Sequence, residues 1–189
     1  METQGAKSFG TIEIICGSMF SGKTKLLIKK ITEAQKNNLT VKVFKPKIDT
    51  RYAKERIVTH DKKGVTAIPV EDPNNIIQLS QSANLVAIDE VQFFNKEIIS
   101  TCEKLSQKNI NIILAGLDLD YLGKPFGIMP ILMKMANKIT KLNAVCDICS
   151  QKAFHTYRVS KIEKKIMLGE KGEYLALCKD CFQKKIKHG

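Results

Sequence analysis

The octapeptide GSMFSGKT, residues 17–24, fits the pattern G-x-x-x-x-G-K-[ST] through Gly17, Gly22, Lys23 and Thr24. Glycines at these positions let the backbone turn its N–H groups toward phosphate oxygens, and a helix N-terminus behind the loop adds the positive end of a dipole. The lysine reaches the β- and γ-phosphates, and the threonine hydroxyl ligates Mg²⁺. We therefore predict that this loop binds the phosphates of a nucleotide. Its other residues are Ser18, Met19, Phe20 and Ser21.

Two adjacent acids, Asp89 and Glu90, follow the apolar run LVAI at residues 85–88. A strand beside the strand of the phosphate loop would deliver both acids to the phosphates, so Asp89 is predicted to hold Mg²⁺, through water. Glu90 has two interpretations. In an ATPase such a residue activates water, and in a kinase it takes the proton of an acceptor hydroxyl.

The elements that must position these residues are indicated by short apolar runs. Strands are predicted at 11–16, 41–44, 85–89 and 111–116, and helices directly after the phosphate loop and around 96–108. Strands that alternate with helices predict an α/β fold with a parallel sheet covered on both faces. The polar stretch 45–64 carries no apolar period and is predicted to be a mobile loop.

The cysteines fall into two groups. Four of the six form two CxxC pairs, namely Cys146, Cys149, Cys178 and Cys181. In a chain without an export signal, such pairs favour a metal over disulfides, and four thiolates suit a closed, structural, tetrahedral Zn²⁺ site. The spacer of 28 residues, 150–177, is predicted to be a long loop pinned at its base. Cys16 and Cys102 lie in apolar contexts and are predicted to fill the core.

The composition limits the class of protein. The chain has 189 residues, of which 43% are hydrophobic, enough for one ordinary domain with a small appendage. We predict a P-loop α/β domain over 1–141 and a zinc-binding domain over 142–189, because the α/β pattern ends near Leu142. No apolar run could cross a bilayer, so a cytoplasmic location is expected. The net charge of +12 favours polyanionic partners without choosing among them.

Seven motifs, all in the order of one known family, resemble those of the cellular-type (type II) thymidine kinases. They are GSMFSGKT (17–24), DTRY (49–52), THD (59–61), DEVQFF (89–94), GLDLDYLGKPFG (116–127), LNAVCDIC (142–149) and GEYLALCKDC (172–181). The resemblance implies a P-loop NTPase-type sheet domain followed by a zinc-bound lasso. It implies transfer of the γ-phosphoryl group of ATP to the 5′-hydroxyl of thymidine, and of deoxyuridine. Feedback by dTTP and a homotetramer are implied too, with no nucleic acid or membrane as partner.

The resemblance also assigns roles to individual residues. Glu90 matches the general base, and Asp89 and Thr24 match the Mg²⁺ ligands. Asp49 and Arg51 match a mobile segment near the phosphates, and Gln92 lies in the strip that lines the nucleotide site. The positions that match contacts to thymidine are Met19, Phe93, Leu117, Tyr121, Thr156 and Tyr174.

Two other functions remain open from the residues alone. A basic P-loop ATPase with a zinc ribbon could bind nucleic acid, although the cysteine-containing region lacks an interleaved basic and aromatic face. A nucleotide sensor without catalysis is the other alternative, and it requires Glu90 to be idle.

Overall fold

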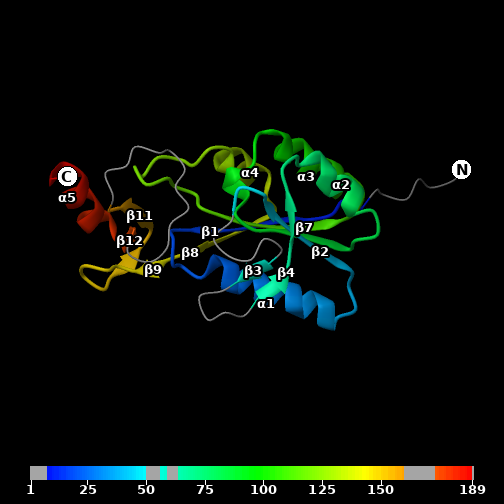
Figure 1. Cartoon of the computed structure of the whole chain (residues 1–189), viewed down its shortest axis with the longest axis horizontal. Coiled ribbons are helices and arrows are strands. Elements are labelled where there is room, and N and C mark those ends of the chain that lie inside the picture. The colour runs from blue at the N-terminus through cyan, green and yellow to red at the C-terminus, as the bar shows by residue number, and fades with distance from the viewer. Residues whose placement is uncertain (1–7, 50–55, 59–63, 160–172, 189) are drawn as a thin grey trace, which may run out of the picture.

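The computed structural model describes residues 8–49, 56–58, 64–159 and 173–188 (Figure 1). Its centre is a six-stranded parallel sheet in the order β5-β2-β6-β7-β1-β8, which confirms the predicted parallel α/β fold. The strands are β1 (Ile12–Gly17), β2 (Val41–Pro46), β5 (Ile68–Val70), β6 (Leu85–Ile88), β7 (Asn111–Gly116) and β8 (Lys138–Leu142).

Helices cover both faces of this sheet (Figure 1). One face packs against α1 (Lys23–Lys36) and the small hairpin of β3 (Arg56–Val58) and β4 (Gly64–Thr66). The other packs against α2 (Asn74–Leu79), α3 (Glu97–Gln107) and α4 (Met129–Met135). The side chains of a strand alternate between its two faces, so Ile14 joins the core under α3 while Ile15 joins the core under α1. Cys16 and Cys102 are buried, as predicted.

A separate small core holds the C-terminal module, which we define as residues 144–159 and 173–188. Two antiparallel pairs build it: β9 (Ala144–Val145) with β10 (Lys152–Ala153), and β11 (His155–Arg158) with β12 (Tyr174–Leu177). Helix α5 (Lys179–His188) follows. Phe182 on α5 belongs to this core together with Leu177 and three of the cysteines, and its ring stacks on that of His155 with centroids 4.5 Å apart. No helix in the described ranges is long and apolar enough to cross a bilayer.

Three predictions need correction. The stretch 45–64 is not one loop, because β2 continues to Pro46 and β3 occupies Arg56–Val58, while residues 50–55 and 59–63 lie outside the described part. The spacer 150–177 is not an open loop at its ends, since backbone hydrogen bonds pair β11 with β12. The strand of Asp89 is not beside the strand of the phosphate loop, because β7 lies between β6 and β1.

Candidate active site and metal centre

The phosphate loop joins β1 to α1, as its sequence predicts. Gly17 has φ +143°, and a Cβ placed there would meet the carbonyl oxygen of Leu142 at 2.3 Å. Gly22 has φ +87° directly before the first residue of α1. Both positions therefore require glycine, the first for the close approach of β8 and the second for its left-handed backbone.

Lys23 is buried, and its Nζ donates a hydrogen bond to the carbonyl oxygen of Ser18 at 2.8 Å. The Ser21 hydroxyl donates to the same oxygen at 2.8 Å. The ammonium group of Lys23 therefore lies inside the curve that the backbone of this loop forms. A phosphate in this curve would meet a positive charge and the N-terminus of α1 together.

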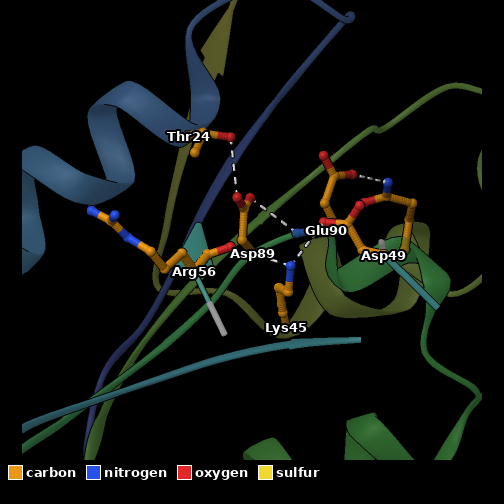
Figure 2. A network of polar contacts seen from close by, with 7 residues as sticks. Thr24, Lys45, Asp49, Arg56, Asp89 and Glu90 are labelled. Atoms are coloured by element: carbon orange, nitrogen blue, oxygen red, sulfur yellow. Dashed lines mark hydrogen bonds and ion pairs between the residues drawn. The ribbon is translucent and has the colours of Figure 1, made fainter. Parts of the chain in front are cut away.

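Thr24 and Asp89 meet although their strands are not neighbours. Helix α1 packs across β7 and β6, so the threonine in its first turn reaches the end of β6. There the Thr24 hydroxyl donates to Asp89 Oδ2 at 3.1 Å, and the Glu90 amide donates to Asp89 Oδ1 at 3.0 Å (Figure 2). Burial, and then the neighbouring Glu90 carboxylate, raises the pKa of Asp89 from its usual 3.8 to about 7.

Glu90 adopts a left-handed backbone conformation with φ +52°, which is uncommon for a residue other than glycine. It precedes the 3₁₀ helix Val91–Phe93 and is held by Gln92, whose Nε2 donates to Glu90 Oε2 at 2.5 Å. Gln92 Oε1 in turn accepts a hydrogen bond from the Leu117 amide at 3.1 Å. A Cβ on Gly116 would meet this oxygen at 2.6 Å, so the glycine leaves room for the glutamine. The carboxylate of Glu90, after the end of β6, is therefore held by Gln92, which is itself bonded to the backbone after the end of β7.

Sequence reasoning missed Lys45, the fifth residue of β2. Its Nζ donates to the Arg56 carbonyl oxygen at 3.2 Å and lies 4.0 Å from Asp49 Oδ2 (Figure 2). Asp49, which was predicted to lie near the phosphates, is thereby placed at the same carboxyl end of the sheet as the two acids. The only signal in the sequence is a lysine at the end of an apolar run, and most lysines in that position are exposed. Arg51 lies outside the described residues.

Aromatic side chains at the positions predicted to contact thymidine lie in two groups. Near the acids, the ring of Phe93 packs edge-on against Phe126, with ring centroids 5.8 Å apart. Phe126 was not singled out from the sequence, although it lies within the quoted motif of residues 116–127. In the second group, the guanidinium of Arg158 lies 3.8 Å from the ring centroid of Tyr121 and 5.7 Å from that of Tyr174.

The phosphate loop is bonded directly to the C-terminal module. The Met19 amide donates to the Thr156 hydroxyl at 3.0 Å, and the Ser18 hydroxyl donates to the Ala153 carbonyl oxygen at 3.3 Å. Along β11, Thr156 and Arg158 are both buried and lie two residues apart, so they share one face of the strand. That face contacts Met19 and Tyr121 of the larger part of the chain.

The four paired cysteines form one cluster. All four Sγ atoms lie within 4.8 Å of one another. In a tetrahedral site with Zn–S bonds of about 2.3 Å, the sulfurs lie about 3.8 Å apart, so the cluster has the size of a metal site. Burial opposes ionisation of the Cys146 thiol, but backbone amides of Cys178, Ile148 and Cys149 donate to it and lower its pKa to about 6. The cluster can therefore hold a structural metal.

Comparison with known proteins gives one consistent result. The model of the thymidine kinase family matches residues 10–182. A thymidine kinase of Bacteroides fragilis is 39% identical over 184 residues, 97% of this chain and 92% of that protein. One from Bacteroides thetaiotaomicron is 41% identical over 95% of this chain and 90% of that protein. One from Rhodothermus sp. is 42% identical over 93% of this chain and 83% of that protein. The chain belongs to the thymidine kinase family.

Membership of the thymidine kinase family confirms the resemblance seen in the motifs and makes the chain an enzyme that transfers phosphoryl groups. Among solved structures, a DNA replication initiation factor superposes with a TM-score of 0.45 and 21% identity, over 72% of this chain and 41% of that one. This superposition is too loose to bear on the function.

Proposed function

We propose that this chain transfers the γ-phosphoryl group of ATP to the 5′-hydroxyl of thymidine, and of deoxyuridine, to give the monophosphate in nucleotide salvage. The observation that best supports the proposal is the contact of Thr24 with Asp89, directly beside Glu90. Two acids with a hydroxyl from the phosphate loop are the set that phosphoryl transfer to an alcohol requires. The relatives that carry the name thymidine kinase supply the substrate.

In this proposal the loop residues 17–24 bind the phosphates of ATP through their amides, and Lys23 stabilises the charge that develops on the transferred group. Glu90 takes the proton of the acceptor hydroxyl, and Gln92 holds Glu90 in place for it. Of the two interpretations of Glu90, we favour the base of a kinase.

The oxygen donors of Thr24 and Asp89 fit Mg²⁺, a hard cation that prefers hydroxyl, carboxylate and water ligands. With ATP bound, Thr24 and Asp89 would hold this ion near the phosphates, where it would supply positive charge against the charge of the transferred group. A cation beside Asp89 would also favour its ionised carboxylate, and would so oppose the raised pKa of this group. The cluster of four thiols would hold Zn²⁺, in a closed site with no position left for a substrate.

The nucleoside would lie between the two groups of aromatic contacts described above. We propose Met19, Phe93, Leu117, Tyr121, Thr156 and Tyr174 as its contacts. Of these, Thr156 belongs to the C-terminal module and bonds the phosphate loop, so it would link the two substrates. Feedback by dTTP, a homotetramer and a cytoplasmic location are further parts of the proposal, and they rest on the family.

One assay separates this function from its two alternatives. The protein would be incubated with ATP and Mg²⁺ together with either thymidine or single-stranded DNA, and both phosphorylated thymidine and free phosphate would be measured. We expect thymidine monophosphate, with little hydrolysis and no stimulation by DNA. Hydrolysis stimulated by DNA would support the nucleic-acid-binding ATPase, and binding of ATP without any turnover would support the sensor.

A loop variant provides the control for this assay. Lys23→Ala keeps the loop amides but removes the charge at the β- and γ-phosphates, so transfer should be abolished. Near-normal turnover in this variant would show that residues 17–24 do not bind the transferred phosphate.

A further inference from the structure

The most deeply buried charged side chain among the described residues is Lys45, which is 1% exposed. It lies on β2, beside Phe44, and its side chain points toward the acids at the end of the sheet (Figure 2). Burying an ammonium group is unfavourable unless charged and hydrogen-bonding partners replace its water. A lysine in this position therefore needs charged or hydrogen-bonding partners, which a hydrophobic residue would not need.

Two of the contacts of Lys45 join different segments of the chain. Asp49 Oδ2 lies 4.0 Å from Nζ and belongs to the turn after β2, where the Asp49 amide donates to the Pro46 carbonyl oxygen at 3.0 Å. The Arg56 carbonyl oxygen, 3.2 Å from Nζ, is at the first residue of β3. One ammonium group thus holds the end of this turn and the start of the β3–β4 hairpin together.

A lysine two residues further along the chain shows the ordinary case. Lys47 forms an ion pair with Glu71 at 2.9 Å, and the two side chains are 67% and 80% exposed. Exposed pairs of this kind contribute little to stability. Lys47 is therefore a matched control for Lys45, with the same charge in the same segment but no contact with the acids.

The surroundings of Lys45 explain why its charge belongs there. Asp49, Asp89 and Glu90 are all buried and lie at the carboxyl ends of β2 and β6. The Asp89 and Glu90 carboxylates repel each other, and a nearby positive charge stabilises a buried carboxylate in its ionised form. Lys23 acts on Asp89 from the side of the phosphate loop. Lys45 acts on Asp49 from the side of β2.

We propose that Lys45 is a positioning residue for the phosphoryl transfer proposed above, on which this inference rests. Its ammonium group holds the Asp49 carboxylate at the carboxyl end of the sheet, where Asp89 and Glu90 also lie, and it anchors the start of β3 there. Lys45 does not touch the substrates in this proposal. It acts through Asp49, and a displacement of about 1 Å at a reacting centre can lower a rate by about 10²-fold.

The test compares Lys45→Met, Asp49→Asn, the double variant and Lys47→Met with the wild type. The turnover number kcat and the KM of each substrate would be measured, and folding would be checked by thermal melting. We expect Lys45→Met and Asp49→Asn each to lower kcat by about 10- to 100-fold. The double variant should be no slower than the slower single variant, because both changes remove the same contact. Lys47→Met should keep the wild-type kcat.

Several outcomes would overturn the inference. They are a wild-type kcat in Lys45→Met or in Asp49→Asn, or losses that multiply in the double variant. Lys45→Met leaves Asp49 buried without its cation and could fail to fold. In that case Asp49→Asn is compared with the double variant, in which neither charge is left, and equal kcat values are expected. Lys45→Arg keeps the charge on a wider group and should recover part of the loss.

Failure of this inference can be told apart from failure of the proposed function. If Glu90→Gln keeps its turnover, the proposed base is wrong, whatever the Lys45 variants do. If Glu90→Gln is inactive while Lys45→Met is normal, the proposed function stands and Lys45 is only part of the fold.

Discussion

The backbone amide of Met19 donates a hydrogen bond to the hydroxyl of Thr156 at 3.0 Å, across 137 residues of sequence. Met19 belongs to the phosphate loop, and Thr156 belongs to the C-terminal module. A second bond, from the Ser18 hydroxyl to the Ala153 carbonyl oxygen, runs in parallel. Movement of the module would therefore pull on the loop that we propose binds ATP.

Thr156→Val tests this connection because valine keeps the shape of threonine and removes the acceptor. The Met19 amide would lose its partner, at a cost of about 1–3 kcal/mol. We expect kcat/KM for thymidine to fall by about tenfold, since 1.4 kcal/mol corresponds to a factor of ten. Steady-state kinetics with varied thymidine at saturating ATP measures it. Thr156→Ser keeps the hydroxyl and should remain close to the wild type, whereas equal losses in both variants would show that the packing of the whole side chain, not the hydrogen bond alone, matters.

Glu90→Gln tests the proposed base. Glutamine keeps the size of the side chain, can still accept the hydrogen bond from Gln92, and tolerates the left-handed φ of +52° as glutamate does. We expect kcat to fall by about 10²- to 10⁴-fold with little change in the binding of ATP. Rapid-quench kinetics and equilibrium binding would measure the two effects separately. A variant that loses affinity for ATP but keeps its maximal rate would instead identify Glu90 as a ligand of the metal.

Asp89→Asn is expected to change how the stability of the folded chain depends on pH. Burial and Glu90 raise the pKa of Asp89 from 3.8 to about 7 in the folded chain, so between these values the folded state binds more protons than the unfolded state. Stability must then fall as the pH rises through this window. Asparagine cannot ionise, so the variant should be close to the wild type near about pH 4 and more stable near about pH 8, by roughly 1–4 kcal/mol.

Urea unfolding at several pH values without Mg²⁺ would measure this difference. Glu103→Gln, an exposed carboxyl group on α3, is the control and should show no such trend. A difference between Asp89→Asn and the wild type that stays constant over this range would show that Asp89 remains ionised throughout. The variant should also lose kinase activity, which would make Asp89 a residue that costs stability and serves function.

The phosphate loop and four strands of the sheet could be predicted because their signals are local. The loop has a fixed spacing of glycines, and β1, β2, β6 and β7 are short apolar runs. Strands β5 and β8 were missed because both lie at edges of the sheet, where a strand is half exposed and its pattern is mixed. β5 contains Pro69, which is disfavoured in a central strand, and β8 mixes Lys138 and Lys141 with Ile139 and Leu142.

The candidate site could be predicted only as far as its motifs reach. Asp89, Glu90 and the cysteine pairs are recognisable by spacing, whereas the burial of Lys45 depends on two segments that meet only in the folded chain. The contact of Arg158 with Tyr121 likewise joins residues that are far apart in the sequence. No periodicity in the sequence encodes such contacts, because they depend on how separate elements pack.

The last prediction concerns the metal. We expect one zinc per chain at Cys146, Cys149, Cys178 and Cys181, because their sulfurs already lie within 4.8 Å of one another. Cys146 follows β9 and Cys178 follows β12, so the ion would join the β9–β10 pair to the β11–β12 pair. Backbone hydrogen bonds between β11 and β12 also order part of the spacer. The ion should therefore fix the position of this pair rather than create it.

Cys178→Ser should accordingly raise the KM of thymidine more than the KM of ATP. The module contributes Thr156 and Tyr174 to the proposed thymidine contacts, whereas the phosphates of ATP are proposed to bind a loop in the larger part of the chain. A looser module must be ordered when thymidine binds, and that entropy is lost from its affinity. The experiment counts zinc per chain, confirms that the variant is folded, and compares both KM values with the wild type. Equal losses for both substrates in a folded variant would mean that the cysteines only stabilise the fold, and active enzyme purified without metal would disprove the zinc site.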